Sequence, residues 1–186
     1  MIGYAFCGSF CTHKKSLETL KKIISLGYEV QPIMSETVYS TDTRFGTASS
    51  LCEQVIGICG RDIIHTIVQA EPLGPKIKLE AMIISPCTGN TLAKIANGIT
   101  DTSVSMAAKA HLRSNRPLII ALASNDALSS NLKNIGSLLS RKSVYFVPLE
   151  QDEPIEKPHS LIADFDLLPE TLSAALKGEQ YQRVFK

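Results

Sequence analysis

The sequence predicts a Rossmann-like, flavodoxin-like α/β fold, in which a doubly wound parallel sheet carries helices on both faces. Two observations predict this class. Apolar runs of strand length alternate along the chain with segments in which apolar residues recur at helical spacing. Four of the apolar runs also end in small polar loops, and in such folds these loops lead from a strand into a helix.

The first strand is predicted at Ile2–Cys7, and it runs directly into the turn Gly8–Thr12. Leucine and isoleucine then keep helical spacing as far as Leu26, where Gly27 is suited to end the helix. The run at Tyr28–Met34 predicts the second strand. These three elements form the start of a doubly wound sheet.

A polar loop is expected at residues 39–46, before a helix at Ala48–Cys59. Residues 63–68 form a short apolar segment, and the prolines and glycine of residues 71–76 predict a rigid loop. The run at Ala81–Ile84 predicts the third strand.

A small polar loop follows that strand, and Leu92, Ile95, Ala96 and Ile99 then lie on one helical stripe. The remaining elements alternate in the same way. They are a helix at Ser103–Arg113, a strand at Pro117–Ala123, a helix at Leu128–Lys142, a strand at Val144–Pro148 and a helix at Pro169–Lys177. Residues 151–158 are expected to be an extended loop, and the last residues to be frayed.

Length and composition limit the class of protein. A chain of 186 residues is expected to be a single domain over 1–186, with 151–186 as an extended loop plus a short helix. The formal charge of +1 excludes an argument from net charge for nucleic acid or an anionic membrane. No apolar run approaches the ~18 residues that cross a bilayer. The start of the chain, MIGYAFCGSF, lacks the basic region of a signal peptide.

Cysteine and histidine usage predicts a reduced, cytoplasmic chain without a metal. The five cysteines form no CxxC pair, and the four histidines have no ligand spacing.

Small hydroxyl and amide residues follow four of the predicted strands. They lie at Gly8–Ser9, Ser35–Thr37, Ser85–Thr91 and Ser124–Asp126. Because the carboxyl ends of parallel strands share one edge of the sheet, we expect these residues to form one site. Free N–H groups at the helix starts favour phosphate there, although helix capping is the alternative for each hydroxyl. The sequence has no GxGxxG and no GxxxxGK[ST], so a dinucleotide or NTP fingerprint is not supported.

Several long motifs resemble one family across nearly the whole chain. They are GSFCT at 8–12, STDTRFG at 40–46, QAEPLGPKI at 69–77, SPCTGNTLAKIANGITD at 85–101, SVSMAAKAHLR at 103–113, SNDAL at 124–128 and YFVPLEQDEPIEKPHSLIA at 145–163. In these stretches the chain resembles the family of dipicolinate synthase B subunits of spore-forming bacteria. That family is in turn similar to the homo-oligomeric flavin-containing cysteine decarboxylases.

The resemblance implies an FMN site. Gly8 and Ser9 match the phosphate-binding turn of the decarboxylases, and Ser35 and Thr37 match their flavin-contacting hydroxyls. The segment at 86–91 stands where those enzymes carry a PASANT motif. The residues implied for the cofactor are Gly8, Ser9, Ser35, Thr37, Thr88, Gly89, Asn90, Thr91, Ser124 and Asn125.

Two departures from the decarboxylases are visible. Their PxMNxxMW segment is replaced by Ala123–Asp126, and the cysteine of their flexible cap has no counterpart. Oxidative decarboxylation of a peptidyl cysteine is therefore not expected.

The reaction that the resemblance implies is oxidation of dihydrodipicolinate to dipicolinate during sporulation, in the mother-cell cytoplasm. Arginine suits a dicarboxylate substrate, so Arg44 is the first candidate and Arg113 or Lys76 the second. A base is also needed, and Asp126 and His13 are both open candidates.

The resemblance leaves the role of the chain open. In one reading it is a catalytic subunit that carries FMN and passes electrons to NAD(P) on a dinucleotide-binding A subunit. In the other it is a non-catalytic subunit that binds flavin or substrate. The third and less favoured reading is a lone decarboxylase, and homo-oligomers are implied in each.

Overall fold

Seven strands lie in one sheet in the computed structural model, which describes all 186 residues. The strands are β1 Ile2–Phe6, β2 Val30–Met34, β3 Ala81–Cys87, β4 Leu118–Ser124, β5 Val144–Phe146, β6 Leu149–Glu150 and β7 Leu161–Ala163. β2, β1, β3, β4 and β5 are parallel neighbours in that order. The predicted doubly wound parallel sheet is thus confirmed.

The edge beyond β4 is mixed. β5 pairs with the first half of β4, whereas β7 pairs antiparallel with its last two residues, Ala123 and Ser124. β6 then pairs antiparallel with β7. Both of these short strands lie where the sequence predicted no strand, because two- and three-residue strands leave no periodic signal.

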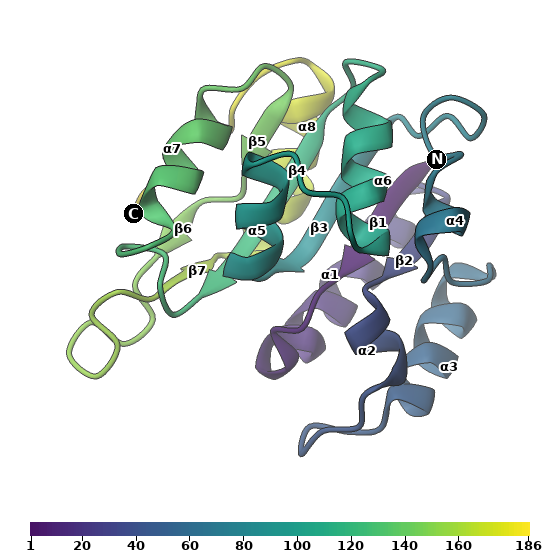
Figure 1. Cartoon of the computed structure of the whole chain (residues 1–186), viewed down its shortest axis with the longest axis horizontal. Helices are drawn as coiled ribbons and strands as arrows, with labels where there is room; N and C mark the ends of the chain where they lie inside the picture. The colour runs from purple at the N-terminus through teal and green to yellow at the C-terminus, as the bar shows by residue number, and fades with distance from the viewer.

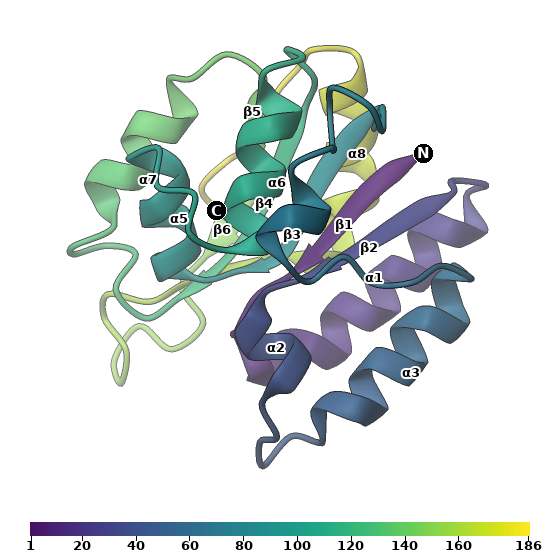
Figure 2. The same cartoon turned by 45° about the vertical axis from the view of Figure 1, so that its right-hand side comes forward.

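Helices cover both faces of the sheet (Figures 1 and 2). They are α1 His13–Ser25, α2 Glu36–Ser40, α3 Ala48–Cys59, α4 Ile67–Ala70, α5 Gly89–Ala96, α6 Ser103–Leu112, α7 Leu132–Leu139 and α8 Leu168–Leu176, with 3₁₀ turns η1 Phe10–Thr12 and η2 Phe165–Leu167. α1 contacts α3 and α8 on one face, while α6 contacts α4 and α5 on the other. Every residue of β1 and β3 is buried, as expected of parallel strands between two helical layers.

Three sequence predictions need correction. α5 ends at Ala96, because Asn97 and Gly98 (φ +72°) close it, so Ile99 is 48% exposed instead of lying on the buried stripe. α7 begins at Leu132 and not at Leu128, because the preceding residues form a hydrogen-bonded turn around Asp126. The chain end is not frayed, since the Leu149 amide donates to Val184 and the Lys186 amide to Leu149.

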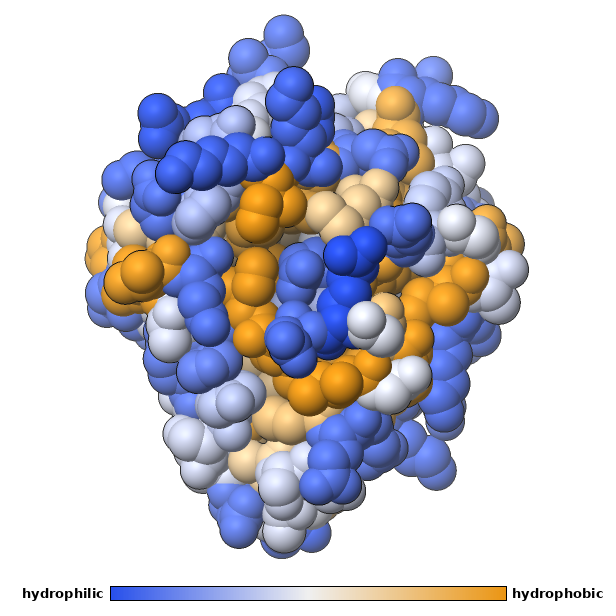
Figure 3. Space-filling model, turned by 90° about the vertical axis from the view of Figure 1, so that its right-hand side faces the viewer, coloured by the Kyte–Doolittle hydropathy of each residue, from blue (hydrophilic) through white to orange (hydrophobic).

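The face beyond β2, the last strand on its side of the sheet, carries exposed apolar patches around a polar hollow (Figure 3). A depression there is lined by Gln31, Arg61 and Asp62 among apolar residues. Val68 of α4 is 82% exposed. This side of the molecule is therefore not a purely polar surface. None of the helices combines the length and apolar character needed to cross a membrane.

Candidate functional site

The carboxyl ends of β1, β2 and β3 meet at one point on the edge of the sheet. Phe6 pairs with Met34 of β2, and Ala5 pairs with Ile84 of β3. Beyond the strands, the Ser35 amide donates to the Phe6 carbonyl at 3.0 Å, and the Cys7 amide to the Pro86 carbonyl at 3.2 Å. The chain passes from β1 outward to β2 and then crosses back to β3, so the strand order reverses here. Open α/β sheets bind ligands at such a switch point.

The loop after β1 leaves one hydroxyl available. The Thr12 hydroxyl donates to the Ser9 carbonyl at 2.8 Å and fixes the turn into η1. The Ser9 hydroxyl itself has only the Cys11 sulfur as a neighbour, at 4.0 Å, and it makes no capping bond. Ser9 can therefore bind a ligand at this edge.

The loop after β2 combines a cap with a free hydroxyl. The Ser35 hydroxyl accepts the Val38 amide at 3.3 Å and so caps α2, a helix that the sequence did not predict. The exposed Thr37 side chain makes no hydrogen bond within the chain. The Glu36 carboxylate turns away and accepts the Ser103 amide at 2.9 Å. Glu36 thus ties α2 to the start of α6, and its charge does not face the edge.

The loop after β3 begins α5. Thr88 caps this helix, because its hydroxyl accepts the Thr91 amide at 3.2 Å while donating to the Thr91 hydroxyl at 3.1 Å. The exposed Asn90 side chain makes no hydrogen bond within the chain. The first amides of α5, from Gly89 and Asn90, have no partners within the helix. This helix start therefore offers an amide side chain and backbone N–H groups.

A buried hydroxyl cluster of Tyr4, Ser16 and Ser85 supports these loops from below. The Tyr4 hydroxyl lies 2.9 Å from the Ser16 carbonyl and 3.0 Å from the Ser85 hydroxyl. The Ser16 hydroxyl donates to the Ser85 carbonyl. Burial raises the pKa of Tyr4 to about 12, although the two serine hydroxyls oppose the shift. The cluster stays neutral and joins β1, α1 and β3.

Cys7 and Cys87 lie buried at the same strand ends. Burial raises the pKa of Cys7 to about 11 and that of Cys87 well above its ordinary value. Neither thiol is a thiolate at neutral pH, so both act as small apolar residues and not as nucleophiles.

The turn after β4 is bonded to itself. The Asp126 carboxylate accepts the Ser124 hydroxyl at 2.5 Å, the Ser130 hydroxyl at 2.7 Å and the Asn131 amide at 2.9 Å. These bonds, the one from Ser124 first, hold the pKa of Asp126 below its ordinary value. Asn125 is exposed and accepts the Ser160 hydroxyl at 3.5 Å. Asp126 is consequently a poor proton acceptor.

α5 packs directly against this turn. A Cβ on Gly89 would lie 2.4 Å from the Ser124 hydroxyl and 2.7 Å from the Asp126 carboxylate. Glycine is therefore required where the helix start meets the turn. All ten residues implied for the cofactor lie along this edge.

The three candidate cations for the substrate are not brought together. Arg44 lies on an exposed turn after α2, with its guanidinium 4.9 Å from the Phe45 ring centroid. Arg113 follows the end of α6, next to the start of β4. The loop at Gly74 packs closely against this end of α6, since a Cβ on Gly74 would touch the Ala110 carbonyl. Lys76 belongs to this same loop region. Arg113 and Lys76 thus lie at the amino-terminal edge of the sheet, away from the strand ends that carry Ser9 and Asn90.

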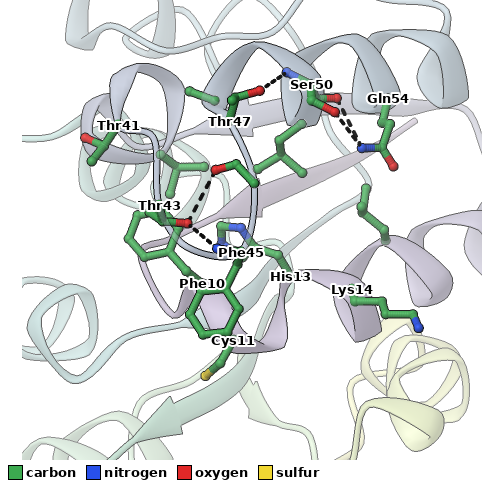
Figure 4. A pocket seen from close by; sticks show the side chains of 15 residues that line it. Phe10, Cys11, His13, Lys14, Thr41, Thr43, Phe45, Thr47, Ser50 and Gln54 are labelled. Carbon is green, nitrogen blue, oxygen red and sulfur yellow. Dashed lines mark hydrogen bonds between the residues drawn. The ribbon is translucent and has the colours of Figure 1, made fainter.

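Next to the edge, a cavity of about 540 Å³ opens between η1–α1 and the segment from α2 to α3 (Figure 4). Phe10, Cys11, His13 and Lys14 line one side, and Phe45, Thr43, Thr47, Ser50 and Gln54 are among the residues of the other. Sequence reasoning missed this cavity, although the motif at 40–46 contained part of its wall. No group of three or more His, Cys, Asp and Glu side chains is placed to hold a metal ion.

The chain is similar to known proteins over most of its length. The family model described as Flavoprotein matches residues 1–167. The B subunit of dipicolinate synthase from Bacillus subtilis (strain 168) is 42% identical over 183 residues, which are 98% of this chain and 92% of that protein.

Solved structures agree with this assignment. The crystal structure of the dipicolinate synthase B subunit from Bacillus halodurans C has a TM-score of 0.92 and 43% identity, covering 100% of this chain and 95% of the other. A dodecameric FMN-dependent UbiX-like decarboxylase from Escherichia coli O157:H7 has a TM-score of 0.63 and 24% identity, with 79% of each chain covered. This second likeness concerns the fold alone.

Proposed function

Because the chain belongs to the Flavoprotein family, we propose that it is the flavin-carrying B subunit of a dipicolinate synthase. The reaction proposed is the oxidation of dihydrodipicolinate, which loses two electrons and two protons to become pyridine-2,6-dicarboxylate. The proposal is supported by the similarity to the Bacillus subtilis protein over 98% of the chain. The observation that carries it is the set of free polar groups at the ends of β1, β2 and β3.

The residues at this edge fit FMN. Thr37 and Asn90 present side-chain donors without partners in the chain, and Ser9 has only the Cys11 sulfur, at 4.0 Å, as a neighbour. Two backbone amides at the start of α5 suit a phosphate, because a helix start carries positive dipole charge. The nearest carboxylates do not oppose this, since Glu36 faces Ser103 and Asp126 is satisfied by its own turn. When bound, the flavin supplies the two-electron acceptor, and the protein supplies orientation and electrostatics.

The substrate brings two carboxylates, and Arg44 is the cation proposed to meet one of them. Arg44 is exposed, forms no ion pair and lies on the turn that walls the cavity. A planar guanidinium can bind a carboxylate through two parallel hydrogen bonds.

The partner proposed is the A subunit of dipicolinate synthase, which would bind NAD(P) as the electron acceptor. We also propose a homo-oligomer of this chain, since a relative of the same fold is dodecameric. The site of action proposed is the mother-cell cytoplasm of a sporulating bacterium.

One observation favours a second candidate function, in which the chain binds flavin or substrate without catalysing the reaction. Asp126 is the only carboxylate among the candidate bases, and it already accepts hydrogen bonds from Ser124, Ser130 and Asn131. In that case the dinucleotide-binding partner would perform the redox chemistry.

Absorbance spectroscopy tests the main proposal. The purified chain is mixed with excess FMN, freed of the unbound fraction and measured again, alone and with the A subunit. Flavin bands that remain with the wild-type chain and are lost in Asn90→Ala or Ser9→Ala would support the flavin-carrying role. A colourless chain under both conditions would exclude it and favour the second candidate.

A further inference from the structure

His13 is held in one orientation by its surroundings. Its Nε2 lies 2.8 Å from the Cys7 carbonyl oxygen. A carbonyl oxygen only accepts, so Nε2 carries a proton and donates it. The Phe6 ring packs edge-on at 5.9 Å between centroids, and the Phe10 ring lies at 5.2 Å. These contacts fix the tautomer and the plane of the imidazole.

The other nitrogen of His13 is available. Nδ1 of His13 makes no hydrogen bond within the chain. Among the fully buried side-chain nitrogens and oxygens, only Nδ1 of His111 lacks a partner, so the unpaired Nδ1 of His13 is not fully buried. The space that the His13 side chain lines is the cavity of about 540 Å³ (Figure 4). Burial lowers the pKa of His13 below its ordinary 6.5, against the opposing effect of the Cys7 carbonyl. At neutral pH the ring is neutral and Nδ1 is a free acceptor.

The remaining walls suit a flat anion. Phe10 and Phe45 present aromatic rings, and Lys14 is an exposed cation without an ion-pair partner. The titratable groups that line the cavity are His13, Lys14 and Cys11. The polar side chains from the α2–α3 side are threonine, serine and glutamine, which do not ionise. Arg44 and Asp42 lie on the adjoining turn, where the Asp42 carboxylate accepts the Ala48 amide at 2.8 Å. No carboxylate lines the cavity itself, so the groups that line it are neutral or positive.

We propose that this cavity binds the ring of the dicarboxylate substrate, with Lys14 on one carboxylate and Nδ1 of His13 as the proton acceptor. This inference rests on the proposed function and names the base that it requires. Flavin bound at the adjacent edge would supply the two-electron oxidant for the hydride that the ring carbon loses. A proton leaves the ring for Nδ1, and the remaining electron pair completes the aromatic ring. His13 becomes an imidazolium, which then releases the proton to water.

The cavity lies next to the edge of the sheet where FMN is proposed, because both are formed by the segment that follows β1. Phe10 and Cys11 follow Ser9 directly, and His13 hydrogen bonds to Cys7 at the end of β1. The same η1 turn thus forms one wall of the cavity and one side of the edge where the flavin is proposed.

Nitrogen-15 NMR of the FMN-treated wild-type chain tests the proposal without turnover. At pH 7 His13 is expected to show a protonated Nε2 and an unprotonated Nδ1. Addition of dipicolinate should move Nδ1 toward the protonated shift, because the bound dianion favours the imidazolium. Lys14→Gln should weaken dipicolinate binding about tenfold, which corresponds to ~1.4 kcal/mol, whereas Lys15→Gln, which removes a neighbouring cation outside the cavity, should not.

Kinetics with the A subunit provide the second test. His13→Gln keeps an amide donor for the Cys7 carbonyl but removes the base, so kcat should fall roughly 10²- to 10⁴-fold. The loss of kcat/KM on acidification below pH 6.5 should disappear as well. His159→Gln, which alters an exposed histidine outside the cavity, should keep both kcat and the pH profile.

The NMR and kinetic results can contradict the role of His13 without contradicting the proposed function. A flavin-loaded His13→Gln enzyme that keeps the wild-type kcat and the wild-type loss of kcat/KM on acidification would overturn the role of His13. The proposed function would not be contradicted by that result. A protonated Nδ1 at pH 7, or displacement of dipicolinate by FMN, would overturn the cavity assignment even if the variant did not fold. Absence of both flavin uptake and turnover in the wild type would overturn the function and this inference with it.

Discussion

The loops after β1, β2 and β3 and the turn after β4 are made of the same small polar residue types, yet their hydrogen bonding differs. In the first three loops, Thr37 and Asn90 keep side-chain groups without partners in the chain, and Ser9 has only a long contact with the Cys11 sulfur. In the turn after β4, the side chains of Ser124, Ser130 and Asn131 all converge on Asp126. The difference is a carboxylate that accepts donors of its own turn, since Asp126 does so whereas Glu36 in the loop after β2 accepts from Ser103 of α6.

Residue type at a strand end therefore does not distinguish a binding loop from a structural one. A charged acceptor satisfies neighbouring donors, and it turns the loop into a rigid support. Without such an acceptor, the same hydroxyls remain free for a ligand. We therefore expect substitutions in the β4 turn to change stability, and those in the loops after β1, β2 and β3 to change flavin affinity.

Gly89→Ala should have the largest effect, because it forces the two regions apart. The added Cβ would lie within 2.7 Å of Ser124, Asn131 and Asp126. Overpacking of this kind costs up to ~3 kcal/mol. Chemical denaturation of the flavin-free chain measures the loss. Gly57→Ala in α3 meets nothing within 4 Å and should stabilise by about 0.5–1 kcal/mol. Wild-type stability in Gly89→Ala would contradict the close packing.

Asp126→Ala should follow with a loss of about 2 kcal/mol, because three donors lose a charged acceptor on a half-exposed turn. Urea denaturation checks the value. Glu53→Ala, which removes an exposed carboxylate of α3, should stay within ~0.5 kcal/mol of wild type. Equal effects of the two substitutions would show that the turn is not organised by Asp126.

Ser9→Ala and Asn90→Ala should each weaken FMN binding about tenfold, or ~1.4 kcal/mol. Flavin fluorescence titration measures the affinity. The stability of the flavin-free chain should change by less than ~0.5 kcal/mol, since neither side chain makes a strong internal bond. Ser137→Ala on the exposed side of α7 serves as the matched control. A loss of stability at Ser9 or Asn90 would remove the contrast between the regions.

The smallest expected effect is a change in how stability depends on pH at Asp126. The pKa of Asp126 in the folded chain lies below its ordinary 3.8, because the bonds from Ser124, Ser130 and Asn131 favour the carboxylate. Its contribution to stability is therefore present above that value and is lost as the pH falls through the folded pKa. As the pH is lowered from 5 to 3, the melting temperature of Asp126→Asn should fall less than that of the wild-type chain. The difference should be small and salt-dependent, because the carboxylate is partly exposed.

Much of the fold could be predicted from the sequence because its strands are buried on both faces. The all-buried run at Ala81–Ile84 shows no helical period and carries isoleucine, so the pattern favours a strand. The paired short strands β6 and β7 could not be found in this way, since their pairing with β4 is long-range.

The site could be predicted only in outline. Placement of Ser9 and Asn90 at one edge followed from the parallel sheet. The self-bonded state of Asp126 did not, because its partners Ser130 and Asn131 come from the next turn of the chain. The position of Arg113 could have been found, since a crossover helix runs back along the sheet and ends at its opposite edge.

The buried cluster of Tyr4, Ser16 and Ser85 has an evolutionary consequence. Its three hydroxyls come from β1, α1 and β3 and satisfy one another inside the core. Loss of any one would remove a buried hydrogen bond from each of the other two, at about 1 kcal/mol for each bond. Replacement of all three by apolar residues would avoid that cost. Across related sequences we therefore expect these positions to covary, either kept together or exchanged together.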